Sequence, residues 1–419
     1  MTRCSVSACL GFLLALLVAC VAPAAAQTDE KIVEIRVHGN HTTSGDEVVA
    51  LSGLSVGGAA TADLLKAAED KLRASHRFEG VEVRRRFASI EDLNAILIVI
   101  VVDEREGVSA NTPLPGPLRR LGLASLWMPI LNFIDGYGFT YGARISFADP
   151  IGPQTRISIP LTWGGERRAA LEVERTFQGK AWSSVSGAVD TYRRVNPHFE
   201  TPDLRVEGRG RVERKFTPWL RAGAAARIAR VDFGGEVDTH DAEGVDVTFD
   251  TRVDPSFPRN AVHMRLGWEH MGFEAGSAGM WKGDLRGYVG VGGSRVLALR
   301  AQFARASAAL PPSEQPLLGG SDTLRGYRTG YRAGDRLAAA SAELRVPLNS
   351  PFNFARLGVK GFIDAGTVWS SSARLADQPF DHGIGGGFYA GIAALMFDLD
   401  VAWPESGSPH VHVGLGVTF

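Results

Sequence analysis

From about residue 136 to its end, the chain alternates apolar and polar side chains with a period of two. Leu204, Val206 and Val212, for example, are separated by charged neighbours. Three further stretches repeat the pattern: 262–269, 297–303 and 397–403. This period is typical of β-strands with one apolar and one polar face. It predicts antiparallel strands, in either a soluble sandwich or a transmembrane barrel.

Two details favour the barrel. Several segments have about the ten-residue length of a tilted transmembrane strand. Many carry an aromatic residue near one end, as interfacial girdles do: Trp163, Phe177, Trp182, Trp219, Trp281 and Trp403. The chain also ends on an alternating strand that includes Val417 and closes with Phe419, which resembles the C-terminal signal of outer-membrane barrels.

The number of such segments suggests the size of the barrel. We find about fifteen, and bacterial single-chain barrels use even strand numbers. We therefore expect a transmembrane antiparallel β-barrel of about 16 strands over residues 135–419, with 14 as the alternative. The overlooked strand is expected in Leu121–Ile134 or in Arg193–Pro202.

A smaller module precedes the barrel. An alternating strand that ends at Gly39-Asn40 is followed by helical segments over Asp46–Leu51 and after the N-cap residue Thr61. Two more strands follow, and Ile96–Val102 is apolar on both faces, which predicts a central strand covered by the helices. We expect one α+β domain over residues 27–105 and a linker over 106–134.

The first residues have the form of a secretory signal peptide. A basic start, a short apolar stretch and Ala24-Ala25-Ala26 predict a signal peptide over residues 1–26, with lipidation at Cys20 as the alternative. All three cysteines lie in this leader, so disulfides and cysteine-bound metals are not expected in the mature chain. The formal net charge of -1 gives no argument for nucleic acid as a partner.

A long Gly/Pro-rich loop carries the most informative candidate site. It contains Arg325, and the two strands that follow it in sequence carry Glu343 and Asp364 on their polar faces. If these strands wall a barrel, both acids point into the lumen. The loop could then fold inward and pair Arg325 with both carboxylates. Gly326 would let the backbone approach the wall, and Tyr327 would pack beside it.

Three motifs in this order resemble the BamA/TamA superfamily of outer-membrane assembly factors, of the bacterial surface antigen type. They are Leu324-Arg325-Gly326-Tyr327, the strand around Ala340-Ser341-Ala342-Glu343, and Phe362-Ile363-Asp364-Ala365-Gly366. The resemblance implies a lumenal lock made by the loop arginine and the two acids. It also makes the small module a single periplasmic POTRA domain, and it places the barrel in the outer membrane of a Gram-negative bacterium.

The resemblance further implies a function without enzymatic chemistry or cofactor. The expected partners are unfolded outer-membrane or secreted polypeptides and the lipid bilayer, with periplasmic chaperones as candidates. We expect the POTRA edge to capture clients, and a seam between a first strand near Gly136–Phe147 and the last strand, His410–Phe419, to template their insertion or translocation. The alternative is a passive outer-membrane channel or structural surface protein, for which inward arginines would suit anions.

Two other signals are weaker. Gly53-Leu54-Ser55-Val56-Gly57 matches a nucleophile-elbow pattern, but it is expected between two helices, where no strand precedes the serine. His410 and His412 alternate onto one face, yet no third ligand lies near them in sequence, so a lumen-facing pair is favoured over a metal site.

Overall fold

The computed structural model of the protein contains two compact units. The described residues are 30–40, 43–75, 77–88, 95–104, 125–148, 150–152, 154–177, 181–350, 355–392 and 395–417. The predicted signal peptide, with the alternative lipidation site Cys20, lies outside them, as does Phe419 of the predicted C-terminal signal. Of Val417, only the backbone is described. No helix in these residues is long and apolar enough to cross a membrane.

The small unit has the predicted order of strand, two helices and two strands. Its elements are β1 Lys31–His38, α2 Gly45–Ser52, α3 Ala62–Ala74, β2 Phe78–Phe87 and β3 Ala95–Glu104. The sheet order is β1-β3-β2, with β3 parallel to β1 and antiparallel to β2. The predicted central position of Ile96–Val102 is confirmed. β1 and β2 are the two edges of this sheet.

Local capping and burial explain why these residues fold in this way. The hydroxyl of Thr61 accepts a hydrogen bond from the Leu64 backbone N–H at 3.3 Å and caps α3. Three side chains at helical spacing are buried: Leu65, Ala68 and Leu72. They join one core with the inner face of β3, which supplies Ile96, Ile98 and Ile100. One face of the sheet is thus covered by apolar helix surface.

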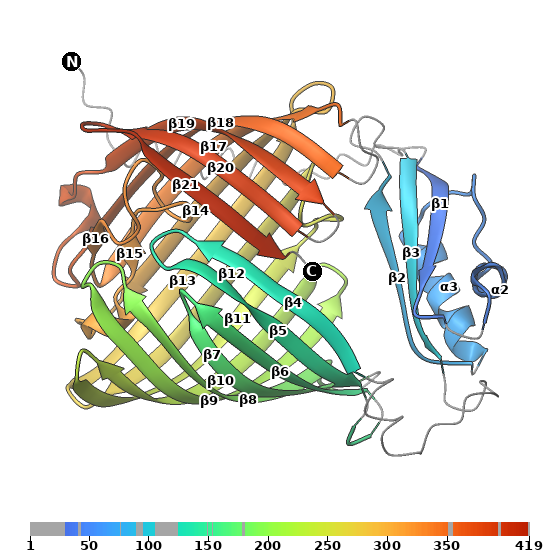
Figure 1. The fold of residues 1–419 in the computed structure, drawn as a ribbon, viewed down its shortest axis with the longest axis horizontal. Helices are drawn as coiled ribbons and strands as arrows, with labels where there is room; N and C mark the ends of the chain where they lie inside the picture. Colours follow the sequence, from blue (N-terminus) through green and yellow to red (C-terminus); the bar gives the residue numbers. More distant parts are fainter. Residues whose placement is uncertain are drawn as a thin grey trace. The chain divides into compact units, whose positions relative to one another are not determined.

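The second unit is a closed barrel of sixteen described strands with antiparallel neighbours throughout (Figure 1). The predicted 16 strands are confirmed in preference to 14. In chain order they are β4 Ser125–Ile134, β5 Gly138–Ala148, β6 Thr155–Gly164, β7 Arg167–Thr176, β8 Ser184–Asn196, β9 Thr201–Thr217, β10 Leu220–Phe233, β11 Glu236–Asp250, β12 Ala261–Phe273, β13 Gly276–Gly290, β14 Val296–Ala306, β17 Arg336–Leu348, β18 Ala355–Trp369, β19 Asp381–Ile392, β20 Leu395–Pro404 and β21 His410–Val417.

The start of the barrel corrects one boundary. Residues 106–134 were expected to be a linker, but β4 occupies Ser125–Ile134 and pairs with β5 along its whole length. The strand overlooked in Leu121–Ile134 is therefore the first strand of the barrel, and the stretch Gly136–Phe147 belongs mainly to the second. The alternation test missed β4 because almost every position in its sequence is apolar.

The two faces of the barrel strands follow the alternation in the sequence. On β9, Leu204 and Val206 are exposed on the outer surface, whereas Arg205 and Glu207 are buried toward the lumen. Apolar side chains therefore cover the lipid side and charged side chains line the interior, as a membrane barrel requires.

One long connection lies inside the barrel. Residues 307–335 join β14 to β17 and contain a short helix, Pro312–Glu314, and two short strands, β15 Leu317–Leu318 and β16 Arg332–Ala333. A second short helix, Leu375–Asp377, lies between β18 and β19. Leu318, Leu324 and Tyr327 of the long loop pack with Leu337, Ala339 and Val368 of the wall in a small apolar cluster. This cluster fixes the loop against β17 and β18.

We predict that Leu72→Ala destabilises the small unit by about 2–5 kcal/mol, because a fully buried leucine is replaced by a cavity. Both α-helices in the described residues lie in this unit. Urea titration of the full chain, followed by the helical circular dichroism signal, therefore reports on it. Val56→Ala, at an exposed position, is the control. Equal midpoints for the two variants would contradict the packing described above.

Candidate functional site

The structure brings Arg325, Asp364 and Glu343 together inside the barrel. Two guanidinium nitrogens of Arg325 donate to the Asp364 carboxylate, Nε to Oδ2 at 2.7 Å and Nη2 to Oδ1 at 2.8 Å. The Arg325 backbone N–H also donates to Asp364 Oδ2, at 3.0 Å. Arg325 Nη1 donates to Glu343 Oε2 at 2.6 Å. Asp364 thus holds both the side chain and the backbone of the loop residue.

Two further groups complete the contacts of the guanidinium. Nη1 lies 3.2 Å from Asp400 Oδ2 on β20, and Nη2 donates to Ser341 Oγ on β17 at 3.0 Å. The Arg325 side chain is only 8% exposed, and its carboxylate partners are equally buried. A buried charge is stable only when it is paired and hydrogen-bonded, and here every side-chain donor nitrogen has a partner.

The surplus of acidic groups is balanced by two more cations. Lys360 Nζ lies 3.0 Å from Asp400 Oδ1, and Arg345 Nε lies 2.7 Å from Glu343 Oε1. Lys360 also pairs with Asp398 at 2.6 Å. The site is therefore a network of charges on β17, β18 and β20, with the loop arginine at its centre. Such networks hold a single arrangement because each member satisfies its neighbours.

An aromatic ring and two glycines shape the wall beneath Arg325. The guanidinium carbon stacks 3.3 Å from the centroid of the Phe362 ring, a cation–π contact. A Cβ at Gly385 on β19 would lie 2.6 Å from Phe362 Cζ, and one at Gly383 would collide with the Arg325 carbonyl oxygen. Glycines on β19 therefore make the room in which the ring and the loop sit.

The other predicted residues adjoin the lock. Gly326 has φ +95°, and a Cβ there would lie 3.0 Å from the Pro404 nitrogen, so the position favours glycine on both grounds. Tyr327 is buried and packs on Tyr331, with ring centroids 4.6 Å apart. A Cβ at Gly366 would lie 2.7 Å from Leu318 Cδ1, so Gly366 makes room for the loop.

A second anchor of the same loop was not found from the sequence. Glu314 of the loop accepts from Arg205 Nη1 at 2.6 Å and from Arg227 Nη2 at 3.1 Å, and it lies 3.1 Å from His240 Nδ1. These partners stand on β9, β10 and β11, away from the strands that hold Arg325. The loop is thus bound at two places. Its cation Arg325 binds acids on β17 and β18, and its anion Glu314 binds arginines on β9 and β10.

The sequence signals for the missed residues were weak. Asp400 was known to lie on the polar face of its strand, but nothing in the pattern selected it over Asp398 as a partner of Arg325. Glu314 sits in a loop, where alternation carries no information. Of the histidine pair, His410 is exposed and His412 is buried, and no cluster among the described residues could hold a metal ion.

The pattern Gly53–Gly57 does not form a nucleophile elbow. Gly53 is the C-cap of α2, with φ 71°, so a helix and not a strand precedes the serine.

The seam between β21 and β4 is the weakest part of the barrel ladder. In the described residues these strands share one register pair, Leu415↔Phe133, whereas β20 pairs with β21 from Leu395↔Val417 to Ala402↔His410. Figure 1 shows β21 in red beside β4 in teal. β4 also contains Pro129, which lacks the backbone N–H that a ladder needs and is typical of edge strands.

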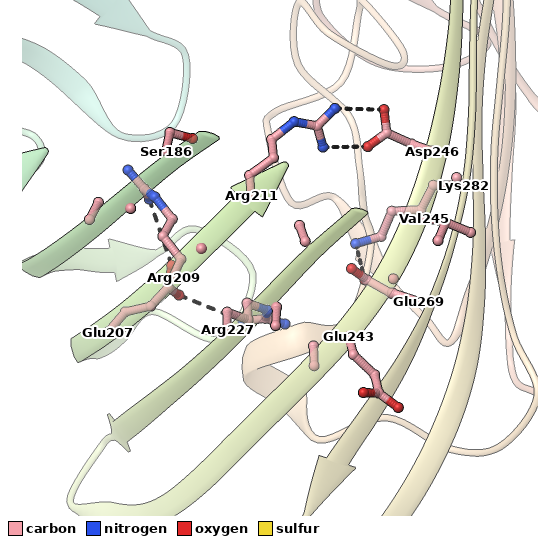
Figure 2. A pocket seen from close by; sticks show the side chains of 18 of the residues that line it. Ser186, Glu207, Arg209, Arg211, Arg227, Glu243, Val245, Asp246, Glu269 and Lys282 are labelled. Carbon is pink, nitrogen blue, oxygen red and sulfur yellow. Dashed lines mark hydrogen bonds and ion pairs between the residues drawn. The ribbon is translucent and has the colours of Figure 1, made fainter. Parts of the chain in front are cut away.

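A cavity of about 720 Å³ opens on the inner face of β5–β13 (Figure 2). Its lining contains basic and acidic side chains in equal number, and many are paired with each other. Arg211 binds the Asp246 carboxylate through two nitrogens, and Arg209 lies 3.0 Å from Asp190. Inward arginines alone would suit a channel that conducts anions. Because acidic side chains balance them in this cavity, its lining gives no reason to expect that selectivity.

Comparisons with known proteins agree with this architecture. BamA from Haemophilus ducreyi lacking POTRA domains 1-3 superposes with a TM-score of 0.60 at 13% identity, covering 92% of this chain and 84% of that one. CdiB from Escherichia coli gives a TM-score of 0.52 at 14% identity, covering 99% of this chain and 97% of the other. At these identities the likeness is one of fold. A search of curated proteins found no match.

The family model of the Omp85 superfamily domain matches residues 195–419. The solved relatives share the barrel, and the small α+β unit is consistent with a POTRA domain. Because the matched region covers more than half of the chain, the protein belongs to the Omp85 superfamily, the non-enzymatic outer-membrane assembly and translocation proteins of Gram-negative bacteria.

Proposed function

We propose that this protein inserts or translocates client polypeptides at the seam between β4 and β21. The observation that carries the proposal is the single register pair between these strands in the described residues, where every other pair of neighbouring barrel strands shares six or more. Unpaired edge strands offer backbone N–H and C=O groups to another extended chain. A client strand could therefore pair with the edges of β4 and β21 and then be released into the bilayer.

The POTRA domain has the complementary role of client capture in this proposal. Its three-stranded sheet ends in β1 and β2, and residues 57–60 already bond to the start of β1, so β2 is the edge without a strand partner in the described residues. An unfolded outer-membrane or secreted polypeptide can add a strand to such an edge, using main-chain hydrogen bonds that do not depend on its sequence. Periplasmic chaperones are candidate donors of these clients.

The lock around Arg325 keeps the loop in a defined position beside the seam strands. Arg325 reaches Asp400 on β20, the strand next to β21. The rival function is a passive channel or a structural surface protein. The charge balance of the lumen gives this rival less support than the inward arginines alone did. A large steady conductance in planar bilayers, with no effect on clients, would favour it.

We predict that a disulfide across the seam abolishes client insertion. Continuing the register of Leu415↔Phe133 places Gly416 opposite Asn132, at the spacing that a disulfide spans. The sequence from residue 27 onward contains no cysteine, so Asn132→Cys with Gly416→Cys gives one defined crosslink. Insertion should disappear on oxidation and return on reduction.

The matched control for this crosslink is Gly187→Cys with Gly210→Cys, which joins β8 and β9 where they are already paired. This control should insert clients normally in both redox states. Full activity of the oxidised seam variant would rule out a seam that must open.

We predict that Arg325→Ala destabilises the folded barrel in detergent. The substitution leaves Asp364 buried without the cation that binds it and removes one of the two arginines that bind Glu343. Leaving a buried charge unpaired costs on the order of 3–5 kcal/mol in a dry site and less in a wet one. Gel mobility after heating to increasing temperatures measures the loss of the folded form. Arg328→Ala is the control, since its side chain is 55% exposed in the same loop. Equal transition temperatures for the two variants would speak against the lock.

We also predict that liposomes containing the wild-type chain accelerate the folding of a denatured test barrel over empty liposomes. Arg325→Ala should reduce this acceleration, because the loop is no longer fixed beside the seam. Arg328→Ala should retain it. If the wild-type chain does not accelerate folding, the protein is not a general insertase, and a transporter for one dedicated client or a pore becomes the better interpretation.

A further inference from the structure

A buried histidine connects the loop to the last strand of the barrel. The Gly326 backbone N–H donates to His412 Nε2 at 2.9 Å. Because this nitrogen accepts, the ring hydrogen of the neutral histidine is on Nδ1, which donates to Asp135 Oδ2 at 2.5 Å. The His412 side chain is 2% exposed. Neither Asp135 nor His412 was among the residues that the sequence assigned to the lock.

Asp135 belongs to the other side of the seam. It starts the turn, residues 135–137, that joins β4 to β5. This turn packs directly on the loop, since a Cβ at Gly136 would lie 2.5 Å from Thr329 Cβ. A Cβ at Gly320 would likewise lie 3.3 Å from Asp135 Oδ2. The loop therefore touches the β4 hairpin as closely as it touches β21.

The two seam strands are thus tied together through the loop as well as through their own ladder. Among the residues that the structure describes, the ladder contributes the pair Leu415↔Phe133. The loop contributes the continuous chain Asp135–His412–Gly326, and Gly326 directly follows the arginine of the lock. Loss of the His412 acceptor would leave the buried N–H of Gly326 without this partner, a cost that moving the loop away from the seam relieves.

We propose that the Asp135–His412–Gly326 chain is a clasp that holds the seam closed and couples its opening to the loop. His412 is a positioning residue in this device, since it acts by holding Gly326 and Asp135. The proposal rests on the proposed function only in assuming that an open seam serves clients. The clasp itself is a statement about conformation and can be tested without a client.

The test measures distances between spin labels in lipid, in the chain from residue 27 onward, which contains no cysteine of its own. Labels at Leu399→Cys on β20 and Phe139→Cys on β5 report across the seam, and both positions face outward and are exposed. A reference pair, Leu399→Cys with Val359→Cys, lies on the continuous wall, where Val359 pairs with Phe388 and Phe388 with Leu399. The reference pair detects any general loosening of the barrel.

His412→Ala should produce a longer-distance population across the seam and leave the reference distance unchanged. His412→Gln, whose side-chain oxygen can accept from Gly326, should restore most of the short distance. His410→Ala is the matched control, an exposed histidine on the same strand, and should change nothing. Asp135→Ala removes the other end of the clasp without altering a strand and should lengthen the distance in the same way.

A short seam distance in both His412→Ala and Asp135→Ala would overturn the clasp, as would an equal change in the reference pair. Insertion measurements separate this result from the proposed function. If the oxidised seam disulfide blocks insertion while both variants keep the short distance, the clasp fails and the function stands. If the variants open the seam but the disulfide leaves insertion intact, the clasp stands and the function fails.

Discussion

The interior of this barrel depends on one buried guanidinium. Arg325 reaches the lumen on a loop, and a charge in that position is stable only if the wall supplies carboxylates with the right geometry. Asp364 supplies a bidentate contact and binds the backbone as well, while Glu343 and Asp400 complete the coordination. The ring of Phe362 packs against the guanidinium, and the glycines of β19 leave the space that the ring and the loop occupy.

Because the lock fixes the loop, it also fixes what the loop touches. The anion Glu314 binds the cations of β9 and β10, so charges of opposite sign anchor the loop to two parts of the wall. Between these anchors the loop meets His412 and the turn after β4. A barrel normally owes its closure to a continuous ladder of hydrogen bonds. At this seam the described part of the ladder is one register pair, and side-chain and loop contacts also hold the two strands together.

This division suits the function proposed above, in which the seam stays closed until a client strand opens it. A full ladder between β4 and β21 would hold the edges too firmly to exchange partners with an incoming strand. A few specific contacts through a loop concentrate the closing interaction at one end of the seam. Pro129 in β4 and Gly414 and Gly416 in β21 further weaken direct pairing, since proline lacks a donor and glycine weakens strands.

Much of the architecture was predictable because membrane strands repeat a simple rule. Alternation identified most strands and both of their faces, and the parity of Glu343 and Asp364 placed these acids in the lumen beside the loop arginine. β4 escaped because its apolar positions have no alternation. Glu314 was not predicted because a loop has no periodicity. Asp400 was not predicted as a partner of Arg325 because that contact depends on which strands the barrel places near the loop.

The sequence by itself determined the fold class, the face on which the side chains of most barrel strands lie, and the loop arginine with its two nearest acids. These are local properties, set by the period of the strand and by the cost of exposing charge to lipid. Only the tertiary structure decided that Asp135 and His412 meet at the seam, although they lie at opposite ends of the barrel sequence. Closure brings the first and last strands together, and no pattern along the chain records that contact.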